Sequence, residues 1–338
     1  MDKQQTIIIA EAGVNHNGKL RYAIKLIDIA LEAGADIIKF QTFKTEKLVL
    51  RSTKKAKYQV KNTKCNDTQY SMLKKLEMSD AMHQKIINYC NEKKIEFLST
   101  AFNIEELEYL VNLGIKRIKV PSGEITNLPY LEKVASFGLP IIVSTGMSTL
   151  TEVCNAYEVL SKAGVNNNSM TFLHCTSNYP TKLNAVNLRA MKLIKDKLNV
   201  NIGYSDHTTE NETSIAAVSL GAEIIEKHIT LDCKMTGPDH KASIEPPKFK
   251  KLVQSIRKVE QLLGNEEKIP NTIEIENALL VRKSIVSSCR IKKGDKFTSE
   301  NITTKRPALG LSPMLWHKII GTKSKKIYMK DQLIDYEN

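Results

Sequence analysis

The sequence predicts a closed (β/α)8 barrel followed by a small β-rich domain. The first observation is that eight short apolar runs each precede a longer segment with helical spacing. Near-continuous apolar strands that alternate with helices form parallel sheets buried on both faces, and eight such units favour a closed barrel over an open sheet. The second observation is a change to short β-like runs from Arg282 onward, which leaves no room for long helices.

The expected elements follow one another at regular intervals. The expected strands cover residues 6–10, 36–40, 95–99, 116–120, 140–144, 169–174, 199–205 and 222–228. The expected helices that follow them cover residues 19–33, 79–94, 103–113, 128–137, 149–163, 187–198, 211–220 and 246–263. We therefore expect a barrel domain over residues 1–263, a linker or connecting helix over 264–281 and a β-rich domain over 282–338.

Composition indicates a globular protein without a membrane segment. Hydrophobic residues make up 41% of the chain, which allows a sizeable core, and the charged share of 26% is ordinary. The apolar run near the N-terminus is too short for a signal peptide, and no run is long enough to span a membrane. The six cysteines are scattered without a Cys-x-x-Cys motif, so we expect neither a disulfide framework nor a structural zinc site. The expected location is the cytoplasm.

The chain is basic, with a net charge of +13. Residues 44–64 hold eight Lys or Arg and one Glu, and residues 282–338 hold thirteen Lys or Arg and five Asp or Glu. Such stretches indicate nucleic acid, an acidic small molecule steered to its site, or a solvated basic surface. Aromatic residues are only 6% of the chain and no nucleic-acid motif accompanies the charge, so we expect no nucleic-acid partner.

Polar side chains stand at or just past the end of all eight expected strands, where barrels of this type place their active sites. They are Glu11, Lys39, Gln41, Ser99, Thr100, Lys119, Ser122, Glu124, Ser144, Thr145, His174, Thr176, Ser177, Asn178, Tyr179, Ser205, Asp206, His207, Lys227 and His228. Singly, the lysines could reach solvent, the serines could cap helices and the glutamates could pair with the lysines. Their recurrence at all eight ends favours one active site.

Two consecutive strands end on a histidine. Neighbouring strand ends lie about 4.8 Å apart, so His207 and His228 can turn toward one point. Two histidines with open positions for water or substrate oxygens are typical of a catalytic divalent metal. Mixed nitrogen and oxygen ligation suits Mn²⁺, with Mg²⁺, Co²⁺, Fe²⁺ and Zn²⁺ as alternatives.

The remaining strand-end groups match an anionic substrate. Two lysines with Ser and Thr hydroxyls provide charge and donors for a small polyanion such as a phosphorylated carboxylic acid. Glu11 and Glu124 are candidates for acid–base chemistry or for binding hydroxyl groups. Asp239, which follows a Gly-Pro pair after the last strand, belongs either to the same site or to an ordinary turn.

Longer strings around these residues resemble the sialic acid synthase family. They include IIIAEAGVNHNG, IIKFQTFK, KVPSGEITNLPYLEK, LHCTSNYP, GYSDHT, IEKHITLD and GPDHKASIEP. The tail IVSSCRIKKGDKFTSENITTKRP resembles the antifreeze-like (SAF) domain that follows the barrel in that family. The resemblance covers nearly the whole chain.

The resemblance implies an enzyme that condenses phosphoenolpyruvate with an N-acylated amino sugar and water, giving a nine-carbon 2-keto acid and phosphate. The main expectation is N-acetylmannosamine as the sugar and N-acetylneuraminic acid as the product. The alternative is N,N'-diacetyllegionaminic acid, made from 2,4-diacetamido-2,4,6-trideoxymannose. A domain-swapped homodimer is implied as well. A rival from another class is a basic protein that binds an anion without turnover.

The resemblance also implies roles for single residues. Those expected to hold phosphoenolpyruvate are Lys39, Thr100, Lys119, Ser122, Ser144 and Ser205, with either Ser177 or Asn178 at its carboxylate. His207 and His228 would bind the metal, and Glu11 and Glu226 would lie near the metal and its water. The groups expected at the sugar are Glu124, Tyr179 and Asp239, joined by Arg306 from the partner chain.

Overall fold

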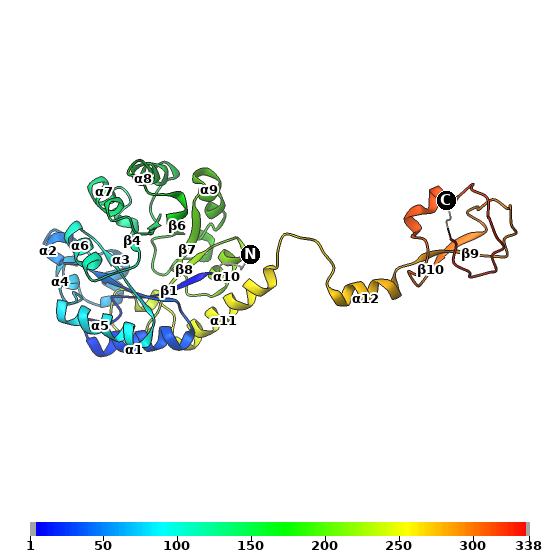
Figure 1. The fold of residues 1–338 in the computed structure, drawn as a ribbon. Coiled ribbons are helices and arrows are strands. Elements are labelled where there is room, and N and C mark those ends of the chain that lie inside the picture. The colour runs from blue at the N-terminus through cyan, green and yellow to red at the C-terminus, as the bar shows by residue number, and fades with distance from the viewer. Residues whose placement is uncertain (1–4, 336–338) are drawn as a thin grey trace. The chain divides into compact units, whose positions relative to one another are not determined.

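Eight parallel strands close into a barrel in sequence order, from β1 to β8, and helices surround them (Figure 1). This arrangement comes from a computed structural model, which describes residues 5–335. The chain forms two compact units, of which the first ends at Gly264 and the second begins at Asn265. The predicted (β/α)8 barrel is confirmed.

Each barrel strand lies within a few residues of its expected position. The strands are β1 Ile7–Gly13, β2 Ile37–Thr42, β3 Glu96–Ala101, β4 Ile118–Val120, β5 Ile141–Ser144, β6 Met170–Cys175, β7 Asn201–Asp206 and β8 Ile224–His228. The pairing of β1 with β8, which runs from Ile7 opposite Ile224 to Glu11 opposite His228, closes the barrel.

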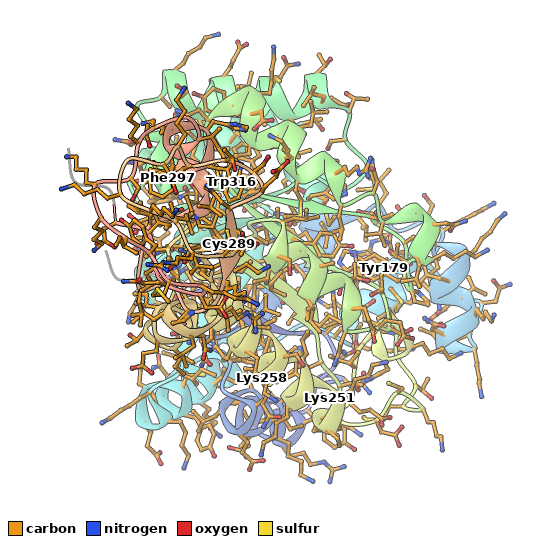
Figure 2. The ribbon with its side chains drawn as sticks, turned by 90° about the vertical axis from the view of Figure 1, so that its right-hand side faces the viewer. Tyr179, Lys251, Lys258, Cys289, Phe297 and Trp316 are labelled. Carbon is orange, nitrogen blue, oxygen red and sulfur yellow. The ribbon has the colours of Figure 1, made fainter. Side chains whose placement is uncertain are left out.

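The helices that follow these strands also match the expected ones. They are α1 Leu20–Ala33, α5 Asp80–Lys93, α6 Ile104–Asn112, α7 Leu128–Ser136, α8 Leu150–Lys162, α9 Arg189–Leu198, α10 Glu212–Ser219 and α11 Pro246–Leu263. Their inner faces pack on the strands through the main hydrophobic core, and charged residues such as Lys251 and Lys258 of α11 are exposed (Figure 2).

One part of the barrel was not expected from the sequence. Between β2 and α5 the chain makes a long connection, residues 43–79, which we call the excursion. It contains three short helices, α2 Thr45–Leu48, α3 Lys57–Thr63 and α4 Gln69–Lys74. The excursion includes the basic stretch 44–64, and its buried residues Phe43, Met72 and Leu76 form a small core with Val14.

The inside of the barrel has its own apolar layer, separate from the core beneath the helices. It consists of Ile9, Ile37, Leu98, Ile142, Leu173 and Ile224. Gly203 of β7 faces the same space, because a side chain there would collide with Leu173 and with the backbone of Ile224. This layer fills the barrel below the level of the strand ends.

The second unit contains α12 Thr272–Val281, an antiparallel pair β9 Ser284–Ser287 and β10 Ile302–Lys305, and α13 Trp316–Ile319. Its own core includes Ile285, Phe297 and Tyr328, with Trp316 packed against it (Figure 2 labels Phe297 and Trp316). A small additional domain of this kind agrees with the sequence. Its assignment as an antifreeze-like domain stays a prediction.

None of the helices among residues 5–335 combines the length and the apolar composition that a membrane span requires. All six cysteines are free.

Candidate active site

A cavity of about 500 Å³ opens at the C-terminal ends of the barrel strands. Every strand contributes to its lining, either directly or through the loop that follows. The sequence-predicted residues that line it are Glu11, Lys39, Thr100, Lys119, Ser122, Ser144, Ser177, Tyr179, Ser205, His207, Glu226, His228 and Asp239. The structure therefore brings most of the predicted site together in one place.

The alternation of side chains along a strand explains why this lining is polar. Successive side chains point to opposite faces, so residue i+2 lies above residue i on the same face. Each residue of the apolar layer has a cavity residue two positions further on: Ile9 and Glu11, Ile37 and Lys39, Leu98 and Thr100, Ile142 and Ser144, Leu173 and Cys175, Ile224 and Glu226. The floor of the site is thus the next inward-facing layer above the apolar one.

Four charged side chains meet at the floor of the cavity, all of them buried. The Nζ of Lys39 lies 2.6 Å from the Glu11 carboxylate and 3.6 Å from that of Glu226. The Nζ of Lys119 lies 3.7 Å from the same Glu226 oxygen and donates to Ser144 Oγ at 2.6 Å. Ser205 donates to the other Glu226 oxygen at 2.9 Å. Glu226 is therefore shared between the two lysines.

These neighbours give the two glutamates different charge states. Burial raises the pKa of Glu11 to about 7, because it outweighs the attraction of Lys39 and is reinforced by the Glu226 carboxylate. Burial acts in the same direction on Glu226, but Lys119 and Lys39 outweigh it and hold the pKa of Glu226 well below its usual value. Glu226 therefore stays ionised at neutral pH between the two lysines, whereas the Glu11 carboxyl can exchange a proton there.

Hydroxyl groups and one backbone amide gather beside Lys119. The N–H of Gly146 donates to Ser122 Oγ at 3.0 Å, and that hydroxyl lies 3.3 Å from Cys175 Sγ. A side chain at Gly146 would collide with Ser177, Ser122 and Cys175, so the loop after β5 approaches these groups as closely as a backbone can. We call Ser122, Gly146, Cys175 and Ser177 the hydroxyl cradle.

The two histidines lie side by side at the rim, with ring centroids 5.5 Å apart. The Nδ1 of His207 lies 2.7 Å from the backbone carbonyl of Thr176, so this nitrogen carries the proton and leaves the Nε2 lone pair free. The Nδ1 of His228 is buried and has no hydrogen-bond partner among the described residues. Burial lowers the pKa of both imidazoles, most strongly for His228, so both are neutral at pH 7.

Neutral imidazoles with free lone pairs are the form in which histidine binds a divalent metal. The pair therefore fits the metal that the sequence predicts. Within residues 5–335 no group of three or more His, Cys, Asp or Glu side chains is arranged as a metal cluster. An ion held by His207 and His228 would therefore complete its coordination with water or substrate oxygens.

Aromatic rings cover the histidine pair. Tyr179 (labelled in Figure 2) lies over His207, with ring centroids 4.3 Å apart, and meets His228 edge-on at 5.8 Å. Tyr58, from α3 of the excursion, stacks on Tyr179 at 5.4 Å. Asp239 lines the same part of the cavity, and burial raises the pKa of its carboxyl to about 6.

The loop that carries Asp239 is held by side chains from two other segments, the loop after β1 and helix α3. Asn17 donates to the carbonyl of Thr236 at 3.0 Å, and Asn62 of the excursion donates to the carbonyl of Pro238 at 2.7 Å. The carbonyl of Asp239 accepts from Ser243 Oγ at 2.8 Å. These bonds fix the backbone on both sides of the carboxylate.

Three of the residues to which the resemblance gives a role do not line this cavity, and neither do the strand-end residues Ser99, Thr145, His174, Thr176, Asp206 and Lys227. Glu124 lies in a single 3-10 turn, Ser122–Glu124, where it accepts a hydrogen bond from Asn127 at 2.5 Å. Asn178 is exposed, whereas the neighbouring Ser177 faces the cavity, which favours Ser177 for the anion contact. Arg306 is exposed in the second unit.

The structure also adds residues that the sequence did not identify. Cys175 is an inward-facing strand residue that lines the cavity. Gln41, which the sequence already placed at a strand end, also lines it and donates to Glu11 at 3.3 Å. Tyr58, Gln59 and Gln69 come from the excursion. The spacing of two from an inward apolar residue would have indicated Cys175. No comparable pattern marks the excursion residues.

Comparison with known proteins gives matches along almost the whole chain. A family model described as the NeuB family matches residues 26–268. The chain is 48% identical over 331 residues to the N,N'-diacetyllegionaminic acid synthase of Campylobacter jejuni, covering 98% of this chain and 99% of that protein. It is 46% identical over 318 residues to the protein of the same name from Legionella pneumophila, covering 94% and 89%.

A solved structure resembles it less closely in sequence. This is the N-acetylneuraminic acid (sialic acid) synthetase from Leptospira borgpetersenii serovar Hardjo-bovis, in complex with citrate. It matches with a TM-score of 0.71 and 32% identity, over 81% of this chain and 90% of that one.

Proposed function

Because the chain belongs to the NeuB family, we propose that it condenses phosphoenolpyruvate with 2,4-diacetamido-2,4,6-trideoxymannose and water. The products are N,N'-diacetyllegionaminic acid and phosphate. The observation that carries this choice of sugar is the 48% identity to a legionaminic acid synthase over nearly the full length of both chains. Identity to the sialic acid synthetase is 32%, so the comparisons support the alternative reading better than the main expectation of N-acetylmannosamine.

The charges of the site support phosphoenolpyruvate as the first substrate. Lys39 and Lys119 supply two buried ammonium groups, and Thr100 and Ser144 orient their Nζ atoms at 3.1 and 2.6 Å. The hydroxyl cradle beside Lys119 adds neutral donors that can direct hydrogen bonds to phosphate or carboxylate oxygens. In the proposed complex, these groups hold the anion with its C3 carbon facing the rim.

The rim supports binding of an amino sugar. Tyr58 and Tyr179 offer aromatic faces, and the Asp239 carboxylate can accept hydrogen bonds from sugar hydroxyl or amide groups. His207 and His228 would hold a divalent metal, for which Mn²⁺ is our first choice. When bound, such an ion supplies a Lewis acid for a carbonyl oxygen.

The reaction makes one carbon–carbon bond and releases phosphate. C3 of phosphoenolpyruvate forms a bond to the aldehyde carbon of the open-chain sugar, whose C=O double bond becomes a C–OH group. Water adds at C2, the C2–O bond to phosphate breaks, and C2 becomes the keto carbon. Of the two water protons, one ends on the new hydroxyl group and the other on phosphate. Glu11, with a pKa near 7, is suited to accept a proton from that water, while Lys39 and Lys119 stabilise the leaving phosphate. Glu226 stays ionised and keeps both lysines in position.

We further propose that the protein acts as a domain-swapped homodimer, in which Arg306 reaches the sugar in the partner's barrel. The support is that α12 leaves five large apolar side chains exposed, namely Ile273, Ile275, Leu279, Leu280 and Val281. Exposed apolar side chains in such number are typical of a helix that packs against another chain.

A comparison of the two sugars tests the proposed substrate. Phosphate release is measured with phosphoenolpyruvate, Mn²⁺ and either the diacetamido sugar or N-acetylmannosamine, with a control that lacks sugar. We expect kcat/KM to be at least about 10-fold higher for the diacetamido sugar, the discrimination that a differing substituent typically gives. A higher value for N-acetylmannosamine would restore the main expectation. Release of no phosphate with either sugar would favour a non-catalytic anion-binding protein.

A further inference from the structure

Each of the two rim histidines follows a charged residue, and these two charged residues face away from the cavity. Ser205, His207, Glu226 and His228 line the cavity, whereas Asp206 and Lys227 do not. Asp206 is paired with Lys227 in the register between β7 and β8. Both side chains are completely buried. The catalytic chemistry proposed above makes no use of either.

Lys227 binds the backbone that carries His207. Its Nζ donates to Asp206 Oδ2 at 2.8 Å, to the carbonyl of Thr208 at 2.7 Å and to the carbonyl of Glu210 at 3.0 Å. An ammonium group has three protons, and these three acceptors use all of them. Lys227 therefore fixes the segment just after His207. Because Lys227 directly precedes His228 in the chain, it links the backbones that carry the two histidines.

Asp206 completes the contact from the other side. Its Oδ1 accepts from the backbone N–H of Thr208 at 2.9 Å, and its Oδ2 accepts from Ser214 of α10 at 2.6 Å. Asp206 and Lys227 thus bind three backbone groups just after His207: the N–H of Thr208 and the carbonyls of Thr208 and Glu210. The first helix after β7 is joined to the same network.

Stability alone does not explain such a pair. Removing two charges from water is unfavourable, and apolar residues of similar volume often serve a fold as well or better. A fixed network is required, however, where two side chains from different strands must keep one relative position. Groups that support metal-binding residues have this effect, and their loss typically weakens metal binding about 10- to 100-fold.

We propose that Asp206 and Lys227 are positioning residues that hold His207 and His228 at the separation needed to bind one divalent cation. This inference rests on the proposed metal site. We call the two residues the β7–β8 clamp.

The test compares metal affinity in variants that remove the clamp. The double variant Asp206→Asn/Lys227→Met removes both charges and approximately keeps the volume, so it avoids leaving one unpaired buried charge. The single variant Asp206→Asn, which is nearly isosteric, provides a second measurement if the double variant does not fold. The matched control is Arg117→Met, which removes the cation of the Arg117–Glu96 pair (2.7 Å) at the opposite end of the barrel.

The full-length proteins are titrated with Mn²⁺ by calorimetry below the unfolding temperature of each variant, and phosphoenolpyruvate binding is measured separately without metal. We expect the clamp variants to bind Mn²⁺ about 10- to 100-fold more weakly than the unsubstituted protein. Phosphoenolpyruvate affinity should change less than about twofold, since the clamp lies outside the cavity, and the control should match the unsubstituted protein in both titrations.

Folded clamp variants that bind Mn²⁺ as tightly as the unsubstituted protein would overturn the clamp and leave the proposed reaction intact. An unsubstituted protein that binds no Mn²⁺ would overturn both the metal site and the clamp. Phosphate release in the presence of chelator would then show whether the proposed condensation proceeds without metal.

Discussion

Gly146 offers a direct test of the hydroxyl cradle. A β-carbon at this position would lie 2.8 Å from Ser122 Oγ and 3.0 Å from Cys175 Sγ, and closer still to Ser177 Oγ. The backbone of Gly146 does not have positive φ, so alanine can be accommodated without backbone strain. The change Gly146→Ala therefore acts by pushing these side chains away from the anion.

The size of the effect follows from the number of donors displaced. A hydrogen bond to a charged group contributes about 1.5–3 kcal/mol. If the methyl group forces one of the two serine hydroxyls out of reach, the KM for phosphoenolpyruvate should rise roughly 10- to 150-fold, since about 1.4 kcal/mol corresponds to a factor of ten. The KM for the sugar should change little, because Tyr58, Tyr179 and Asp239 lie elsewhere on the cavity wall.

The assay is phosphate release at varied phosphoenolpyruvate and saturating sugar. Gly123→Ala is the matched control, because Gly123 also lines the cavity but a β-carbon there meets no atom within 4 Å. We expect its KM to stay within about twofold of the unsubstituted protein, as is usual for a change that touches nothing. A Gly146→Ala enzyme with an unchanged KM for phosphoenolpyruvate would show that the cradle does not bind this substrate.

Three further predictions concern the rim and the second unit. Exhaustive chelation should abolish turnover, and added Mn²⁺ should restore it. The variant His228→Ala should bind Mn²⁺ weakly in calorimetry and keep the circular dichroism spectrum of a folded protein. Full activity without metal would contradict the proposed metal site. Burial raises the pKa of Asp239 to about 6, so its carboxylate is protonated as the pH falls through 6. The KM for the sugar should therefore rise below pH 6, and Asp239→Asn should remove this pH dependence. A pH profile that is the same in Asp239→Asn as in the unsubstituted protein would argue against the role. Arg306→Ala should lower kcat/KM about 10²–10³-fold, the effect of losing one well-placed donor, and refolding it together with His228→Ala should restore activity if Arg306 acts across a dimer. Proven heterodimers that stay inactive would place Arg306 outside the partner's site.

The barrel could be predicted from the sequence because its signal repeats. Each strand is a short and mainly apolar run, and each following helix has an apolar face of regular spacing, so eight local signals support one another. The predicted site at the strand ends follows from the same pattern. Lys39 of β2, Lys119 of β4 and Glu226 of β8 meet because their side chains all face the inside of the barrel. They do so although 187 positions of the sequence separate Lys39 from Glu226.

The excursion could not be predicted in the same way. Its helices span only four, seven and six residues, too few to show an apolar face. Their positions depend on contacts from far along the chain, such as the bond from Asn62 to Pro238. The position of Tyr58 in the cavity wall therefore becomes visible only in the structure, where α3 places Tyr58 on Tyr179. For Ser177 and Asn178 the difficulty is local, because the direction of a loop side chain depends on the turn and not on a strand period.

The buried charges of the cavity floor have a consequence for any attempt to evolve this protein. Ions held away from water disfavour folding by several kcal/mol each unless their partners compensate fully. Lys39, Lys119 and Glu226 stand directly above an apolar layer that would readily extend upward into their place. Selection for heat resistance alone would therefore favour apolar substitutions at the floor and enrich variants that are more stable but inactive. A thermostable catalyst must instead be selected with turnover as a simultaneous requirement, and its improvements should accumulate in the helices and loops that never touch the anion.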